Sequence, residues 1–257
     1  MIKIKNSEEI EAMRRAGRIT ADILAEVCAA VGVGMSTRDL DQIAVKATKV
    51  RNAIGACYNY PGRLKPFPAY VCTSVNDEIV HGIPSKTRKI QSGDIVSLDF
   101  VAEYEGFMGD STRTVAIGEV SEDVKRLLDV TERALYAGID QAVEGNHLGD
   151  ISFAIQCCAE KAGLGIVREL VGHGIGRKMH EAPRIPNYGK RGTGPMLKAG
   201  MTLAIEPMFM LGREEIAIDE DGWTIRTADG KYAAHFEHTV LVTKGAPEIL
   251  TRSGVAP

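Results

Sequence analysis

Four acidic residues lie inside apolar segments that have the pattern of β-strands, and they constrain the fold of this sequence more than any other feature. A buried, ionised carboxylate without a partner is so costly that it protonates or pairs with a cation. One such residue is typical of a salt bridge, for which Arg113, Arg177 and several lysines are available. Four favour a metal centre, so the fold must bring distant segments together. They are Asp99 in segment 94–100, Asp110 in 110–117, Glu206 in 201–208 and Glu237 in 235–242.

A weak internal repeat orders these segments. Helical segments that begin at Gly34 and Gly145 match at an offset of 111 residues. The strand-like segment 93–99 matches 200–206 at an offset of 107, with glycine and acid in register. A third match places Asp110 over Glu237. The matches occur in chain order, which indicates two related halves that meet near residue 118.

We therefore predict a single catalytic domain over residues 1–257, with halves of about 1–118 and 119–257. Its class is α+β: pseudo-twofold halves share a curved, mainly antiparallel sheet, and the helices pack on one face. Asn6 and Glu9 form a capping box for the first helix. Helices are expected from Asn6 to before Gly32, from Ser36 or Thr37 to about Ala47, over Ser121–Val143, and from about Asp150 to Ala162, with strands within 70–83 and 94–118.

Asp99 and Asp110 flank a predicted turn over 102–107. If this turn centres between Tyr104 and Glu105, the two aspartates face each other in an antiparallel hairpin, with β-carbons about 4.5–5.5 Å apart. That spacing suits carboxylates that bridge two metal ions roughly 3.5–4 Å apart. Four carboxylates also balance two divalent ions. Such oxygen-rich ligation with one imidazole favours Mn²⁺, Fe²⁺ or Co²⁺ over a thiolate-type zinc site.

Histidines supply the remaining polar chemistry. His173 lies between two glycines, which let the backbone approach a ligand closely. His180 follows seven residues later, and His81 is a third candidate. Histidines of this kind can bind substrate and stabilise an oxyanion. The others are interpreted as structural, His147 and His235, or as supporting a neighbouring ligand, His238.

Composition narrows the class of partner. The 257 residues can bury a large core, and 44% hydrophobic and 25% charged residues are typical of a globular enzyme. A net charge of −3 without a basic run argues against nucleic acid. No apolar stretch approaches the roughly 20 residues that span a membrane, and the charged first residues differ from a secretory signal. We expect a cytoplasmic monomer whose five cysteines are reduced.

Five motifs of this sequence resemble those of type I methionine aminopeptidases, metallopeptidases of the pita-bread fold. The resemblance runs essentially end to end. It implies an exopeptidase that removes the initiator methionine from nascent chains with a small second residue, in transient proximity to the ribosome. The motifs are SEEIEAMRRAG at 7–17, NDEIVHGIP at 76–84, GHGIG at 172–176, IEPM at 205–208 and EHT at 237–239.

The same resemblance implies a site with two divalent ions, Co, Mn, Fe or Zn. The ions activate a water molecule that attacks the first peptide carbonyl, and they bind the free amino terminus. Glu206 carries the proton towards the leaving amine, His180 stabilises the oxyanion, and His81 contacts the substrate near the scissile amide. The implied ligands are Asp99 on one ion, His173 and Glu206 on the other, and Asp110 and Glu237 shared between them.

The resemblance also implies an apolar pocket for the methionine side chain. The loop between Cys57 and Cys72 is a few residues longer than in many bacterial relatives, which leaves open whether Tyr58 or Tyr60 lines the pocket. The predicted substrate-binding residues are His81, His180, Cys57, Tyr60, Cys72, Met179 and Trp223.

Two other interpretations remain open at this point. A proline-specific peptidase such as prolidase or aminopeptidase P uses similar ligands, but such enzymes carry an N-terminal domain for which we expect no room before Asn6. A binding protein on an inactive peptidase scaffold is expected to have lost ligands that are all present here. Comparing the cleavage of Met-Ala-Ser with that of Ala-Pro peptides distinguishes a methionine aminopeptidase from a proline-specific peptidase. Tight RNA binding by a metal-free protein would favour the second.

Overall fold

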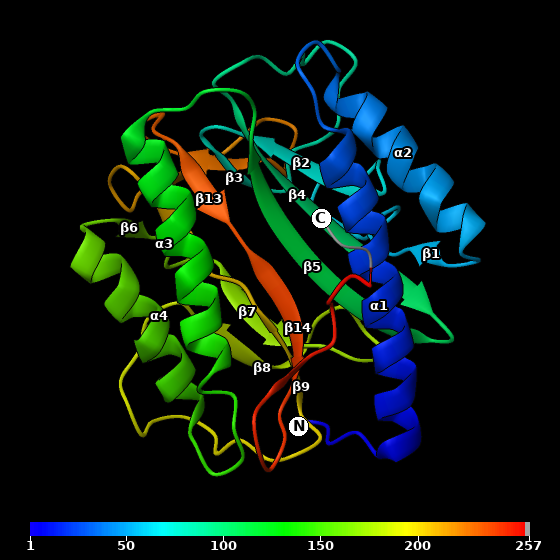
Figure 1. Cartoon of the computed structure of the whole chain (residues 1–257), viewed down its shortest axis with the longest axis vertical. Helices are drawn as coiled ribbons and strands as arrows, with labels where there is room; N and C mark the ends of the chain where they lie inside the picture. Colours follow the sequence, from blue (N-terminus) through cyan, green and yellow to red (C-terminus); the bar gives the residue numbers. More distant parts are fainter. Residues whose placement is uncertain (255–257) are drawn as a thin grey trace.

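Four helices of the described chain, residues 1–254, cover one face of a curved sheet in the structure, which is a computed structural model (Figure 1). On that face, the blue helices α1 (Ser7–Ala30) and α2 (Thr37–Val50) cover one half of the sheet, and the green helices α3 (Glu122–Ile139) and α4 (Leu148–Ala162) cover the other half. All pairs of named strands are antiparallel. The α+β prediction with helices on one face is confirmed.

The first helix begins with the predicted capping box. Asn6 accepts a hydrogen bond from the Glu9 backbone N–H at 2.9 Å, and the Glu9 carboxylate accepts one from the Asn6 N–H at 3.1 Å. Ser36 caps α2 in the same way. The third helix ends at Ile139, four residues before the predicted end, because residues 140–143 continue in tight turns that bond to carbonyls two to four residues back.

The large sheet has the strand order β1-β4-β5-β14-β9-β7-β8, with β2 beside β4 and β15 beside β14. Two small sheets, β13-β10-β6 and β11-β12-β3, complete the fold. The strands are β1 (Ile54–Gly55), β2 (Val71–Val75), β3 (Glu78–Val80), β4 (Ile95–Tyr104), β5 (Phe107–Ala116), β6 (Gly165–Ile166), β7 (Val171–Gly174), β8 (Glu181–Pro186), β9 (Thr202–Ile205), β10 (Met208–Met210), β11 (Ile216–Ile218), β12 (Ile225–Thr227), β13 (Ala233–His235), β14 (Glu237–Leu241) and β15 (Glu248–Ile249).

The β4–β5 hairpin turns one residue later than predicted. Its two loop residues, Glu105 and Gly106, have φ values of 51° and 75°, as a type I′ hairpin turn requires. The register therefore pairs Asp99 with Thr112, and the prediction that Asp99 and Asp110 are direct partners is wrong. A turn one residue later moves the partner of Asp99 by two residues, from Asp110 to Thr112. Because side chains alternate between faces with a period of two, Asp99 and Asp110 still lie on the same face of the sheet.

The two larger apolar cores of the described chain lie between the helices and the sheet. One packs α1 and α2 against β2 and β4, and the other packs α3 and α4 against β9 and β14. No helix in the described part of the chain is both long and apolar enough to cross a bilayer. Fully buried side chains include Ile23, Leu40 and Phe100 in the first core and Leu127, Ile151 and Ile205 in the second.

Candidate metal centre

Each of five adjacent strands contributes one of the predicted metal ligands. Leu98 and Phe100 pack into the core beneath α1 and α2, so strand alternation turns Asp99 towards the opposite face. The same alternation along neighbouring strands brings ligands that are distant in sequence to one place. In sheet order they are Asp99 on β4, Asp110 on β5, Glu237 on β14, Glu206 directly after β9, and His173 on β7.

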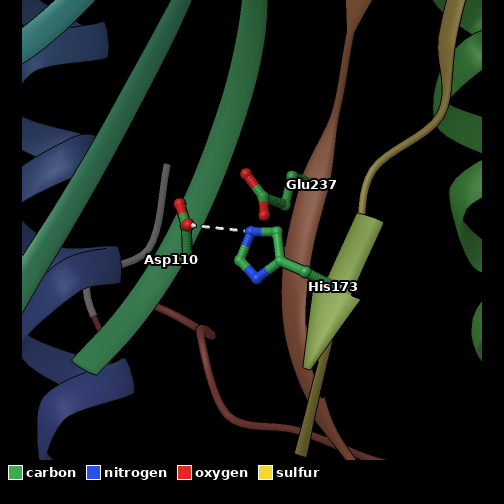
Figure 2. A group of neighbouring side chains, drawn as sticks. All are labelled: Asp110, His173 and Glu237. Carbon is green, nitrogen blue, oxygen red and sulfur yellow. Dashed lines mark ion pairs between the residues drawn. The ribbon is translucent and has the colours of Figure 1, made fainter. Parts of the chain in front are cut away.

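Asp110, His173 and Glu237 point towards one another, as Figure 2 shows. Each offers a ligand atom, and these atoms all lie within 4.8 Å of one another. His173 Nε2 lies 3.7 Å from Asp110 Oδ2 and 3.5 Å from Glu206 Oε1. Three of the predicted ligands, Asp110, Glu206 and Glu237, thus lie around the imidazole of a fourth, His173.

The His173 ring is held in the state that binds a metal. Its Nδ1 lies 3.0 Å from the carbonyl oxygen of Gly174. A carbonyl can only accept a hydrogen bond, so Nδ1 carries the proton and the Nε2 lone pair faces the carboxylates. Burial lowers the pKa of His173 to about 3, which keeps the ring neutral.

The carboxylates are buried without cationic partners. Burial raises the pKa of Asp99 to about 6. It also raises the pKa of Asp110 and Glu237 well above the ordinary value, and the negative charge of neighbouring acids adds to both shifts: Glu237 and Asp99 for Asp110, and Glu206 and Asp99 for Glu237. No lysine or arginine pairs with the four acids within residues 1–254. The salt-bridge alternative therefore fails, since Arg113 is exposed and Arg177 lies over the Phe107 ring.

Buried oxygens without hydrogen bonds remain at this centre. One oxygen each of Asp99, Asp110 and Glu237 is buried and has no hydrogen-bond partner among the described residues. Such groups are costly unless a cation completes their environment. A set of carboxylate oxygens around one neutral imidazole matches the ligand preferences of a divalent metal ion.

The centre forms one wall of a cavity of about 190 Å³. His81 enters it from the residue after β3, where its φ of 59° places a non-glycine residue in the left-handed region. His180 enters from the residue before β8, and its ring packs against His173 with centroids 4.4 Å apart. All of the predicted substrate-binding residues line this cavity: Cys57, Tyr60, Cys72, His81, Met179, His180 and Trp223.

Tyr60, and not Tyr58, is the tyrosine of the cavity. Tyr58 is 47% exposed and stacks on Tyr70. The Tyr60 hydroxyl lies 2.6 Å from His180 Nδ1. Burial raises the pKa of Tyr60 and lowers the pKa of His180, so both groups are neutral. In the tautomer in which the hydroxyl donates to Nδ1, the proton of His180 lies on Nε2.

The opposite wall of the cavity is apolar. Its buried residues form a cluster against which Tyr60 and Trp223 also pack. The Trp223 ring N–H donates to the Lys65 carbonyl at 2.9 Å, and its ring meets the Phe67 edge at 5.2 Å, which closes the long loop over the pocket. Sequence analysis did not identify Phe67, since no periodicity marks a residue in an irregular loop. The cluster is Cys57, Phe67, Ala69, Cys72, Val101 and Met179.

His235 also lines this cavity, although the sequence pattern is interpreted as giving it a structural role. Its Nε2 lies 3.7 Å from Glu206 Oε2. Its place in the sequence could have predicted that His235 faces the cavity, because His235 precedes Glu237 by two residues and strand alternation puts both side chains on one face. His238 points the other way and pairs with Thr251 at 2.9 Å. His147 occupies the N-cap position of α4, where its backbone N–H donates to the Asp150 carboxylate at 2.7 Å.

Comparison with known proteins agrees with this geometry. Residues 11–244 match the model of metallopeptidase family M24, and the chain belongs to this family.

Within that family the chain belongs to the methionine aminopeptidases. It is 48% identical to the methionine aminopeptidase of Clostridium acetobutylicum, over 98% of this chain and 99% of the relative. It is 46% identical to methionine aminopeptidase 1 of Bacillus subtilis, over 98% and 100%. The crystal structure of the Thermotoga maritima methionine aminopeptidase superposes with a TM-score of 0.95 at 43% identity, over 98% of this chain and all of that one.

Prolidases share the fold alone. The Pyrococcus furiosus enzyme superposes with a TM-score of 0.77 at 23% identity, and the match covers 98% of this chain but 66% of the prolidase. The pita-bread fold is thus common to both groups, and the higher identity separates the methionine aminopeptidases. The chain is accordingly a metal-dependent aminopeptidase.

Proposed function

We propose that this aminopeptidase removes an N-terminal methionine from peptides with a small second residue and uses two divalent ions. The observation that supports this most strongly is the convergence of carboxylate oxygens without partners beside an apolar pocket. Four acids balance the charge of two ions and leave His173 as a neutral ligand. The donor set favours Mn²⁺, Fe²⁺ or Co²⁺. The residues that would hold the ions are Asp99, Asp110, His173, Glu206 and Glu237.

The bound ions supply a nucleophile at neutral pH by lowering the pKa of a water molecule. The protein's own groups carry out the remaining steps. Burial raises the pKa of Glu206 well above its ordinary value, so its carboxylate can take up a proton near neutral pH and pass it to the leaving amine. His180 donates its Nε2 proton in a hydrogen bond to the scissile carbonyl oxygen, on which negative charge develops.

His81 contributes as a neutral hydrogen-bonding group near the scissile amide. Burial lowers its pKa to about 4, and its ring meets the edge of Trp223 with centroids 6.0 Å apart. The ring therefore stands between the apolar wall and the metal centre. From there it can orient the peptide without adding charge to the cavity.

The apolar wall selects the first residue. A methionine side chain placed among Cys57, Phe67, Met179 and Trp223 exchanges water for apolar and sulfur–aromatic contacts. We further propose that the enzyme acts on nascent chains as a cytoplasmic monomer near the ribosome.

Release of free methionine tests this function. The protein is stripped with a chelator and assayed on Met-Ala-Ser, Met-Lys-Ser and an Ala-Pro peptide, before and after addition of Mn²⁺, Co²⁺ or Fe²⁺. We expect metal-dependent cleavage of Met-Ala-Ser alone. Calorimetric titration with Mn²⁺ should give two ions per chain. Cleavage of the Ala-Pro peptide, or of none of the three with any metal, would contradict the proposal.

A further inference from the structure

We propose that His235 is a positioning residue that donates a hydrogen bond from Nε2 to the Glu206 carboxylate and holds that carboxylate ready for the metal. The inference rests on the proposed role of Glu206 as a ligand. It assigns a function to a buried histidine that belongs to neither the predicted ligands nor the predicted substrate-binding residues.

The hydroxyl group of Thr114 holds both the backbone N–H and the backbone carbonyl of His235. Its N–H donates to Thr114 Oγ1 at 3.0 Å, and Thr114 Oγ1 donates to the His235 carbonyl at 2.7 Å. On the other edge of β13, His235 pairs with Met208 of β10, two residues beyond Glu206. The ring is therefore directed into the cavity by rigid strands, as positioning a metal ligand requires.

The ring itself has no other partner. His235 is 2% exposed, and neither of its nitrogens has a hydrogen-bond partner within residues 1–254. A buried imidazole N–H without an acceptor is unfavourable. Its Nε2 lies 3.7 Å from Glu206 Oε2, which is too long for a hydrogen bond but within reach of a small rotation of the glutamate side chain.

Glu206 lies between two imidazoles, and only one of them can donate to it. His173 Nε2 lies 3.5 Å from Oε1, but that nitrogen carries a lone pair because the proton is held at Nδ1 by the Gly174 carbonyl. No hydrogen bond from the described residues reaches the Glu206 carboxylate. His235 is thus the available donor. Hydrogen bonds of this kind fix the orientation of metal-binding carboxylates.

Three substitutions in the full chain separate this role from simple packing. His235→Phe keeps the ring volume and removes the donor. His235→Gln restores an N–H close to the position of Nε2, whereas His235→Asn reaches only the position of Nδ1. Mn²⁺ affinity is measured by competition with a fluorescent chelator, and kcat and KM are measured on Met-Ala-Ser. Thermal unfolding of each metal-free variant checks that it is folded.

We expect His235→Phe and His235→Asn to weaken Mn²⁺ binding by about 10- to 100-fold and to lower kcat with KM nearly unchanged. His235→Gln should recover Mn²⁺ affinity to within a few-fold. The matched control is His238→Phe, next to Glu237, whose ring bonds to Thr251 instead; it should keep wild-type Mn²⁺ affinity.

Unchanged Mn²⁺ affinity in His235→Phe overturns the inference, and so does equal loss in the Gln and Asn variants. A rise in KM at constant Mn²⁺ affinity would show that the ring binds substrate instead, which also overturns it. If the wild type binds Mn²⁺ but does not cleave Met-Ala-Ser, the proposed function fails, and the affinities of the three variants still test the role of His235.

Discussion

The two walls of the cavity are built in different ways. The polar wall carries the five predicted ligands, four of them within strands of one sheet that are held by ladder hydrogen bonds and Glu206 directly after β9, with His81, His180 and His235 beside them. The apolar wall is formed largely by the loop between Cys57 and Cys72 and by Trp223, to which the loop is joined by a hydrogen bond from the indole N–H, by the Phe67 ring and by close packing of Gly62. Chemistry that tolerates little displacement is thus placed on regular structure, and side-chain selection is placed on a loop that can vary.

Tyr60 connects the two walls. It belongs to the loop and packs with the apolar cluster, but its hydroxyl bonds to His180 on the polar side. The division between the walls predicts that substitutions in the polar wall change metal binding and kcat, that substitutions in the apolar wall change KM, and that the Tyr60 hydroxyl acts on kcat despite its place in the loop.

The largest effect is expected for Asp110→Asn. Loss of this proposed ligand should lower Mn²⁺ affinity and reduce the cleavage rate of Met-Ala-Ser by about a thousandfold or more. The metal-free variant should be at least as stable as the wild type, because one buried carboxylate that is repelled by Glu237 is gone. Asp123→Asn, at a side chain that is 74% exposed, is the control. Near-normal activity in Asp110→Asn would remove Asp110 from the centre.

Metal binding should weaken strongly as the pH falls. In the metal-free protein the pKa of Asp99 is about 6, so below that pH an incoming ion must displace a proton, and Asp110, Glu206 and Glu237 shift the same way. Each displaced proton lowers the apparent affinity about tenfold per pH unit, or about 100-fold between pH 6 and pH 4. Mn²⁺ titrations at pH 4 to 8 check this. An affinity independent of pH would mean that the acids are ionised without metal.

A substitution in the apolar wall should affect substrate binding alone. Met179→Ala removes buried contacts with the methionine side chain, so KM for Met-Ala-Ser should rise by about tenfold, while Mn²⁺ affinity stays the same. Met196→Ala, at a residue that is 52% exposed, is the matched control. If Met179→Ala instead lowers Mn²⁺ affinity, the two walls are not independent.

The smallest effect, and the sharpest test of the division, is expected for Tyr60→Phe. The ring remains in the apolar cluster, but the hydrogen bond to His180 Nδ1 is lost, and with it the preference for the proposed tautomer that has its proton on Nε2. We expect kcat to fall several-fold with KM almost unchanged, since orientation of the donor is only part of oxyanion stabilisation. Nitrogen-15 NMR of labelled histidines should show a mixed His180 tautomer. A change in KM alone would assign Tyr60 entirely to the apolar wall.

Short-range patterns predicted much of the molecule. The caps at Asn6 and Ser36 are local hydrogen bonds, so sequence spacing was enough to find the helix starts. Turn chemistry was harder to place. The β4–β5 turn was one residue off, because Tyr104-Glu-Gly106 allows two centres and the left-handed conformation of Glu105 depends on the strands it joins.

The sequence by itself determined the ligand types, their strand-like settings and the family that these motifs resemble, because alternation and acid placement are properties of neighbouring residues. Tertiary structure decided which strand lies beside which, and hence that β14 separates β5 from β9 at the centre. It also decided that Tyr60 rather than Tyr58 meets His180 and that His235 faces Glu206. These contacts join residues 29 to 120 positions apart, and no local pattern encodes the packing that closes such distances.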